Sequence, residues 1–315
     1  MKRVRSLRQE RGRAEPGRAG PGQPGGERRE ADRVTTVTVD GRRLRVAVRP
    51  GSDSDGSGGV PLLVCNGIGT PLEALAPFTG ALHPAITVVR FDVPGVGGSP
   101  APRLPYTVPR LAALAGRMMD VLGYRSFDVL GISWGGGLAQ QLAVQHPRRC
   151  RRLVLAATST GSLMVPARPR VLLHLASPRR HRDPAHAARI AGTIYGGALR
   201  RHPELAAPFA GIVYGGAHAA PASRRGYLYQ LAASAGWTSL PWLRLVRQPA
   251  LILAGDDDPI IPLANARLMA ALLPDARLHV YPDGHLGLLT RAAELAPLVS
   301  DFLLAVETST ACAVQ

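Results

Sequence analysis

The sequence predicts an α/β fold in which a mostly parallel, twisted sheet is flanked by helices. Three observations predict it. Short apolar runs recur along the chain, segments with apolar residues at helical spacing separate them, and a serine between glycines lies where one run meets the next helical segment. Such apolar runs are typical of strands buried on both faces. A chain of 315 residues, 46% of them hydrophobic, is long enough to bury this core.

The N-terminal part of the chain is expected to lie outside the parallel sheet. Residues 1–33 are rich in Arg, Gly, Pro and Glu and nearly lack large apolar side chains, so we expect a disordered basic tail. Val34–Val39 and Leu44–Val48 alternate between apolar and polar residues. Asp40 and Gly41 between them are typical of a tight turn, which predicts a β-hairpin.

The parallel strands come next along the chain. Six apolar runs are predicted strands: Pro61–Cys65, Ile86–Phe91, Phe127–Ile132, Leu153–Ala157, Ala250–Ala254 and Ala276–Tyr281. Helical patterns interrupt this rhythm over residues 158–247, where no strand is expected. We therefore predict an α/β core in two halves, residues 34–157 and 248–306, a helical lid at 158–247 and a flexible tail at 307–315.

The segment Gly131-Ile132-Ser133-Trp134-Gly135 carries the first chemical signal. It joins a predicted buried strand to a predicted helix, and a serine on so sharp a turn needs small residues two positions before and after it. The turn lifts the hydroxyl to the end of the sheet and leaves the following backbone N–H free. This is the nucleophile elbow of an α/β-hydrolase fold, which makes Ser133 the predicted nucleophile.

A serine nucleophile requires a histidine base and an acid that orients it, in the chain order Ser, acid, His. Of nine histidines, His285 lies in a glycine-containing loop between the last apolar strand and the C-terminal helix, so we predict it as the base. His279 lies inside that strand, and its alternation with Leu278 and Val280 predicts that it points away from the core.

The acid is expected after the strand Ala250–Ala254, where three aspartates follow one another. A G-x-x-D-x-x-x-P pattern in this loop selects Asp258. Asp256 and Asp257 are expected to cap or solvate the loop, although Asp257 remains an alternative acid. The other position at which this fold places an acid, residues 158–161, holds only Thr, Ser and Gly, which favours Asp258.

The oxyanion formed during ester cleavage needs two N–H donors. One is the backbone N–H of Trp134, directly after the serine. The second is expected from the loop Asn66-Gly67-Ile68-Gly69, where glycines permit a backbone N–H to face the site; Ile68 is the predicted donor. Neither role depends on the side chain.

Composition excludes several other classes of protein. The net charge of +16 includes ten Lys/Arg and five Asp/Glu in residues 1–33, few aromatic residues are present, and no nucleic-acid motif is found, so we expect no nucleic-acid partner. No apolar run reaches the length of a transmembrane segment. Three scattered cysteines have no metal-ligand spacing and suggest a reducing cytoplasm, and Cys65 is expected in the core. No cofactor and no metal are expected.

Several strings of this sequence are unusual among hydrolases of this fold: Asn66-Gly67-Ile68-Gly69, Phe91 to Ser99, Gly131 to Gly136 with Gln140-Gln141, Ala191 to Gly197, Gly236 to Ser239 and Ala254 to Pro259. These strings resemble one family, the intracellular medium-chain-length poly(3-hydroxyalkanoate) depolymerases. The resemblance runs from about Arg45 to Phe302, and the family's serine, aspartate and histidine fall on Ser133, Asp258 and His285.

The resemblance implies a serine hydrolase that cleaves the ester bonds of a stored polyester and releases 3-hydroxyalkanoate oligomers or monomers. It also implies a cytoplasmic protein associated with storage granules. Three alternatives stay open: an esterase or thioesterase on small acyl esters, a 3-hydroxyacyl transferase, and a granule-binding protein without turnover. Lid residues that either contact polymer or pack the lid onto the core are Leu172, Leu173, Leu175, Tyr195, Phe209, Tyr227, Tyr229, Trp237 and Trp242.

Overall fold

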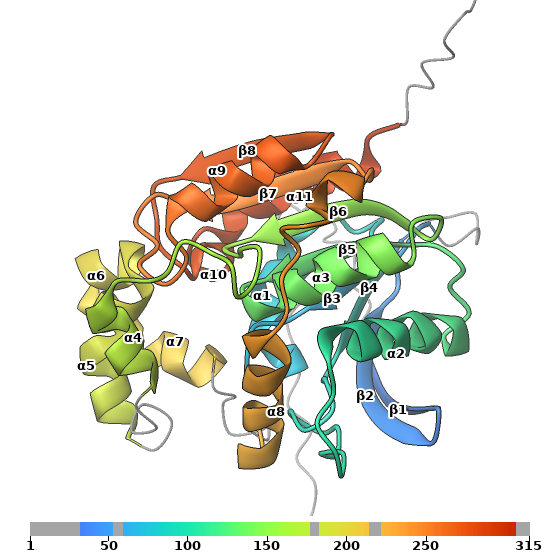
Figure 1. Ribbon diagram of the computed structural model, residues 1–315, viewed down its shortest axis with the longest axis horizontal. Coiled ribbons are helices and arrows are strands. Elements are labelled where there is room, and N and C mark those ends of the chain that lie inside the picture. The colour runs from blue at the N-terminus through green and yellow to red at the C-terminus, as the bar shows by residue number, and fades with distance from the viewer. Residues whose placement is uncertain (1–31, 53–58, 177–182, 214–221, 307–315) are drawn as a thin grey trace, which may run out of the picture.

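The computed structural model describes residues 32–52, 59–176, 183–213 and 222–306 (Figure 1). The predicted tail over residues 307–315 and nearly all of the predicted basic tail lie outside the described residues. The chain enters the fold at Asp32, which forms an ion pair with Arg90, and the first strand begins at Arg33.

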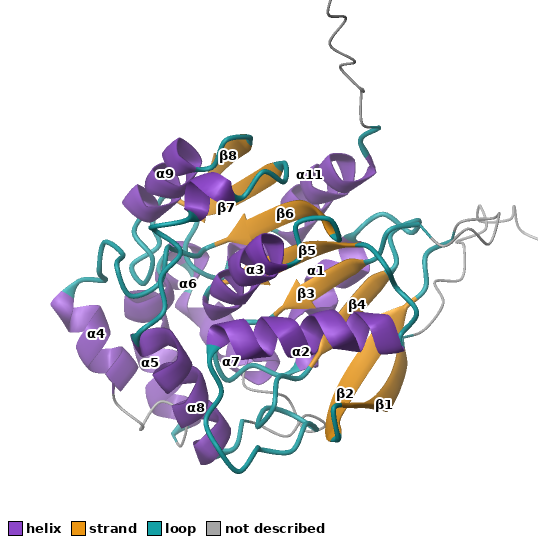
Figure 2. Ribbon diagram, turned by 45° about the vertical axis from the view of Figure 1, so that its right-hand side comes forward, coloured by secondary structure: helices purple, strands orange, loops and turns teal. Residues whose placement is uncertain are grey.

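An eight-stranded sheet in the order β1-β2-β4-β3-β5-β6-β7-β8 forms the centre of the molecule (Figure 2). β1 and β2 form the predicted antiparallel hairpin, β2 pairs antiparallel with β4, and every other neighbouring pair is parallel. The strands are β1 (Arg33–Val39), β2 (Arg42–Arg49), β3 (Leu62–Cys65), β4 (Val88–Phe91), β5 (Phe127–Ile132), β6 (Cys150–Ala156), β7 (Ala250–Gly255) and β8 (Ala276–Tyr281). The predicted α/β class is therefore confirmed.

The sheet has an apolar core on each face, which explains why the sequences of the central strands are unbroken apolar runs. In β3, Leu63 belongs to one core and Leu62 and Val64 to the other; in β5, Val129 and Leu130 divide in the same way. Successive side chains of a strand point to opposite faces, so both faces of these strands must be apolar. Each such side chain, when fully buried, contributes about 1.5–3 kcal/mol of transfer free energy.

Helices cover both faces of the sheet. α2 (Val108–Val121), α3 (Trp134–Gln145) and α9 (Leu263–Leu272) supply side chains to the first core, whereas α1 (Ala76–Ala81), α10 (Gly287–Thr290) and α11 (Ala292–Leu304) pack against the second (Figure 2). None of the described helices combines the length and the apolar character needed to span a membrane.

Between β6 and β7 the described residues form a helical insertion, within the predicted lid range of residues 158–247. Its helices lie beyond one end of the sheet, the end toward which the strand arrows point in Figure 2. A bridge between Gly161 and Thr238 joins the beginning of the insertion to its end. The helices are α4 (Pro169–Ala176), α5 (Pro184–Tyr195), α6 (Gly197–Arg201), α7 (Ala206–Val213) and α8 (Arg224–Ala235).

The strand order reverses at β3. The chain passes from β3 to β4 on one side and then returns to β5 on the other side of β3. In open α/β sheets, ligands bind at the carboxyl ends of the strands where such a reversal occurs. This position lies between the loop after Cys65 and the turn at Ser133, so the topology brings the two predicted oxyanion segments together.

One local prediction, that His279 points away from the core, is wrong. His279 is half-buried and its Nε2 atom is enclosed, while Val280 is 42% exposed. The physical reason is that β8 is the edge strand of the sheet, where apolar alternation is a weak guide to burial because one face is only partly covered.

Candidate active site

The turn at Ser133 explains the glycines on either side of it. Ser133 has φ 53°, a left-handed conformation that costs a non-glycine residue about 1–3 kcal/mol. A Cβ atom on Gly131 would lie 2.4 Å from the carbonyl oxygen of Gly135, and one on Gly135 would lie 2.0 Å from the carbonyl oxygen of Cys65. The strand and the helix approach so closely that neither position has room for a side chain.

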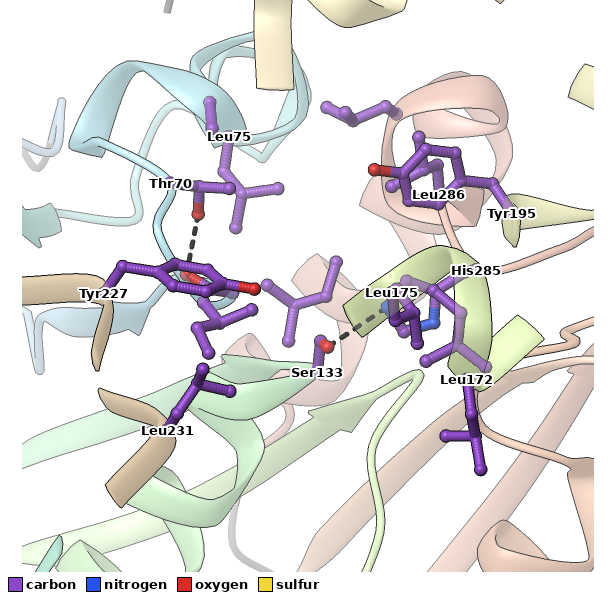
Figure 3. Close-up of a pocket in the computed structure, with 16 residues that line it drawn as sticks. Thr70, Leu75, Ser133, Leu172, Leu175, Tyr195, Tyr227, Leu231, His285 and Leu286 are labelled. Atoms are coloured by element: carbon purple, nitrogen blue, oxygen red, sulfur yellow. Dashed lines mark hydrogen bonds between the residues drawn. The ribbon is translucent and has the colours of Figure 1, made fainter. Parts of the chain in front are cut away.

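Ser133, His285 and Asp258 form one hydrogen-bonded chain, although they come from the turn after β5, the loop after β8 and the loop after β7. Figure 3 shows Ser133 and His285. The Ser133 Oγ lies 3.0 Å from His285 Nε2, and His285 Nδ1 lies 2.8 Å from Asp258 Oδ2. His285 is 5% exposed and Asp258 is 7% exposed. A carboxylate only accepts hydrogen bonds, so Nδ1 carries the proton and Nε2 is free to accept from the serine.

Backbone groups hold Asp258 in place. Its second oxygen, Oδ1, accepts the N–H groups of Ile260 and Ile261, each at 2.9 Å. These bonds satisfy the oxygen that does not face the histidine and fix the orientation of the carboxyl group. The loop after β7 therefore presents a carboxylate whose orientation is determined before any substrate binds.

The neighbouring aspartates face elsewhere. Asp257 accepts the N–H of Gly197 at 2.7 Å and forms an ion pair with Arg200 at 2.6 Å, both in the insertion. Asp256 is exposed. Of the three adjacent acids, the structure brings only Asp258 to the histidine.

The predicted oxyanion segments lie side by side at Ser133. A Cβ atom on Gly67 would lie 3.8 Å from the Ser133 Cβ, and Ile68 lines the cavity into which the serine opens. Trp134 is the first residue of α3, where backbone N–H groups have no partner within the helix. Both predicted segments therefore lie next to the serine.

Two cavities meet at Ser133. The larger has a volume of about 520 Å³ and the smaller about 350 Å³. Of the insertion residues singled out from the sequence, Leu172, Leu175, Tyr195 and Tyr227 line the larger cavity, as Figure 3 shows. Trp237 lines the smaller cavity.

The remaining residues of that group do not line either cavity. Phe209 packs within a small apolar cluster of the insertion, and Trp242 and Tyr229 pack against the main core. Leu173 is 74% exposed. Phe209, Tyr229 and Trp242 therefore pack the protein interior, which is one of the two roles expected from the sequence.

Two contacts of the functional site were not predicted from the sequence, that of Tyr195 with His285 and that of Asp283 with the insertion. The carbonyl oxygen of Tyr195 accepts the backbone N–H of His285 at 2.8 Å, and the two rings stack with centroids 6.4 Å apart. Asp283 is 2% exposed and accepts the N–H of Ala198. The Gly196-Gly197 pair at the start of α6 was the available signal, because paired glycines indicate a close backbone approach.

Cys65 lies beside the site but is no second nucleophile. It is 1% exposed, and burial raises the pKa of its thiol. A buried thiol with a raised pKa is not a thiolate at neutral pH and is chemically inert. Among the described residues, no three His, Cys, Asp or Glu side chains are grouped so that they could hold a metal ion.

Comparison with known proteins identifies the family. The family model of the alpha/beta hydrolase fold matches residues 60–292. The chain belongs to the α/β-hydrolase family. It is 53% identical over 268 residues to a poly(3-hydroxyalkanoate) depolymerase of Ectopseudomonas oleovorans, covering 85% of this chain and 91% of that protein, which confirms the resemblance found in the sequence.

Other members of the α/β-hydrolase family are more distant. A 2-hydroxymuconate semialdehyde hydrolase of Pseudomonas putida is 30% identical over 84% of this chain and 94% of its own length. Among solved structures, the enol-lactonase of Burkholderia xenovorans LB400 superimposes with a TM-score of 0.70 at 25% identity, covering 86% of this chain and all of that one (100%). These hydrolases share the fold and differ in substrate.

Proposed function

We propose that this α/β-hydrolase cleaves the ester bonds of poly(3-hydroxyalkanoate) through an acyl-enzyme on Ser133. The observation that carries the proposal is the hydrogen-bonded chain from Asp258 through His285 to Ser133, which opens into a cavity lined mainly by aliphatic side chains. The 53% identity to a poly(3-hydroxyalkanoate) depolymerase supports the polyester as substrate.

The mechanism follows from this geometry. His285 Nε2 takes the proton of the Ser133 hydroxyl as the oxygen attacks the ester carbonyl, and Asp258 stabilises the imidazolium that forms. The N–H groups of Ile68 and Trp134 stabilise the oxyanion, at about 3 kcal/mol for each donor. His285 then protonates the leaving alcohol. Water, activated by the same histidine, releases the 3-hydroxy acid or oligomer from Ser133.

We further propose that residues 158–247 act as a lid and that the protein works at the surface of a polyester granule in the cytoplasm. Leu172 lines the larger cavity and is 47% exposed, and Leu173 beside it is 74% exposed. Exposed leucines at the mouth of an active-site cavity are suited to contact with an apolar surface. A polymer chain at that surface then reaches the serine without crossing bulk water.

The test is hydrolysis of emulsified medium-chain-length poly(3-hydroxyalkanoate), followed by turbidity and by chromatography of released 3-hydroxy acids. We expect clearing and acid release by the wild type and none by Ser133→Ala. Ser52→Ala, a change at an exposed serine, is the matched control and should retain the activity.

Three other outcomes would contradict the proposal. Cleavage of soluble nitrophenyl esters alone would indicate an esterase on small substrates. Transfer of the acyl group to an added thiol in preference to water would indicate a transferase. Binding of polymer by both the wild type and Ser133→Ala, without product from either, would indicate a granule-binding protein.

A further inference from the structure

The two cavities that meet at Ser133 differ in shape and chemistry. Ser133 and Leu231 are the residues that both cavities share. The larger cavity is lined by aliphatic side chains, among them Leu75, Leu172, Leu175, Leu286 and Leu289. The smaller cavity combines apolar side chains with hydroxyl groups, and its lining includes Met164, Trp237, Ile261, Ser159 and Ser162.

The two cavities also differ in their relation to the base. His285 lines the larger cavity and is absent from the lining of the smaller one. When the tetrahedral intermediate collapses, the histidine must donate its proton to the oxygen of the leaving alcohol. The alcohol oxygen must then lie within hydrogen-bond reach of Nε2, on the side of the larger cavity. The acyl chain is the other substituent of the carbonyl carbon and extends away from the histidine.

The carbonyl group itself lies at the junction of the cavities. Ile68, one proposed oxyanion donor, lines the larger cavity, and Trp134, the other, lines the smaller one. A carbonyl oxygen held between these two N–H groups directs one substituent of the carbonyl carbon into each cavity. Leu231, on α8, lies where the two substituents separate.

We infer that the smaller cavity binds the acyl part of the ester and the larger cavity binds the leaving alcohol, with Leu231 at the boundary. This inference rests on the proposed function. In a polyester, the leaving alcohol is the remaining polymer chain with its alkyl side groups, which matches the larger aliphatic cavity. The acyl part begins with an oxygenated 3-hydroxyacyl unit, and Ser159 and Ser162 are among the residues that line the cavity that receives it.

Two series of soluble esters test the assignment. In one series the acid is lengthened from four to twelve carbons as its ethyl ester; in the other, the alcohol of a butyrate ester is lengthened. Ser162→Trp fills the smaller cavity and Leu175→Trp fills the larger one. Val121→Trp places the same side chain on a 55% exposed position of α2, outside both cavities, and is the control.

We expect Ser162→Trp to lower kcat/KM at least tenfold for the long acids relative to the short ones, and less than twofold across the alcohol series. Leu175→Trp should do the reverse. If Ser162→Trp instead impairs the long alcohols and Leu175→Trp the long acids, or if each variant affects both series equally, the assignment of the two cavities is overturned. The proposed function would stand in either case. If the wild type cleaves no ester in either series, the proposed function fails, and the assignment fails with it.

A second measurement uses the wild-type chain and so does not depend on how the tryptophan variants fold. An alkanesulfonyl fluoride reacts with the serine: the S–O bond forms, the S–F bond breaks, fluoride leaves, and the serine proton passes to His285. The alkyl chain remains on Ser133 in the acyl position. With a photoreactive diazirine at its end, we expect labelling of Met164 or Trp237; labelling of Leu172 or Leu289 instead would overturn the assignment.

Discussion

Removal of the Asp283 carboxylate is the sharpest test of how the insertion supports the active site. Asp283 precedes His285 by two residues in the loop after β8 and is buried against the start of α6. Its Oδ1 atom accepts the N–H groups of Ala198 at 2.5 Å and of Gly284 at 2.7 Å, and its Oδ2 atom accepts the hydroxyl of Thr290 at 2.6 Å. One side chain thus joins the insertion, the histidine loop and α10.

The structure gives the size of the expected effect. Asp283→Ala removes three hydrogen bonds to a charged group, each with a net value of about 1.5–3 kcal/mol, and leaves buried donors unsatisfied. Because the three bonds share one carboxyl group and are not additive, we expect the free energy of unfolding to fall by about 3–5 kcal/mol, near the lower end of their sum. Asp283→Asn retains one oxygen that accepts from Ala198 and Gly284, so it should lose less than half as much.

The same change should also affect catalysis. The insertion holds the His285 backbone through the Tyr195 carbonyl oxygen, and the Asp283 bonds keep these two segments together. A misplaced histidine raises the activation barrier of the reaction, and each increase of about 1.4 kcal/mol in that barrier lowers kcat tenfold. Urea unfolding and nitrophenyl ester kinetics measure the two effects, with Asp256→Asn, at the exposed aspartate, as the control.

The reasoning would be refuted in either of two ways. If Asp283→Ala unfolds at the same urea concentration as the wild type, the three hydrogen bonds do not stabilise the fold. If it is destabilised as expected but keeps the wild-type kcat, the contact between the insertion and the histidine loop is structural and does not position the base.

Three further predictions address the elbow, the acid and the insertion surface. Asp258→Asn should lower kcat about 10⁴-fold, as loss of the orienting acid does in comparable triads, while Asp257→Asn should lower it less than tenfold; similar losses in ester kinetics would contradict the assignment of the acid. Gly131→Ala should reduce the free energy of unfolding by about 3 kcal/mol because its Cβ has no space, whereas Gly80→Ala, where no atom lies within 4 Å of the added Cβ, should not be destabilised. Leu173→Asp should slow clearing of emulsified polymer several-fold and leave soluble-ester kinetics unchanged; a parallel loss on both substrates would argue against a surface-contact role.

The parts of the fold that depend on local sequence were predictable. Phe127–Ile132 and Ala276–Tyr281 are strands with the predicted limits, because apolar runs and the turns that bound them are both visible in one sequence. The predicted strand from Ile86 begins at Val88 instead. Strand ends depend on pairing with a neighbour, here β2 and β3, which no single run of residues encodes.

The candidate site was predictable for the same reason, up to a limit. Ser133 and His285 each lie in a distinctive local context, a strand-to-helix turn with glycines and a loop before the last helix. The contact of Tyr195 with His285 joins residues 90 positions apart in the chain, and Leu231, which lines both cavities, lies on a helix of the insertion. Such features arise from packing between distant segments and leave no periodic pattern in the sequence.

The adjacent carboxylates of Asp257 and Asp258 show how the insertion bears on the chemistry of the core. Both follow β7, and each oxygen pair could accept a hydrogen bond from an imidazole. Asp257 instead binds the N–H of Gly197 and the guanidinium of Arg200, both supplied by the insertion. Arg200 therefore balances the charge of Asp257 at a position away from His285. Asp258 is then the aspartate of this loop that contacts the histidine. The insertion therefore supplies partners for the aspartate that does not contact His285, as well as residues that line the cavities.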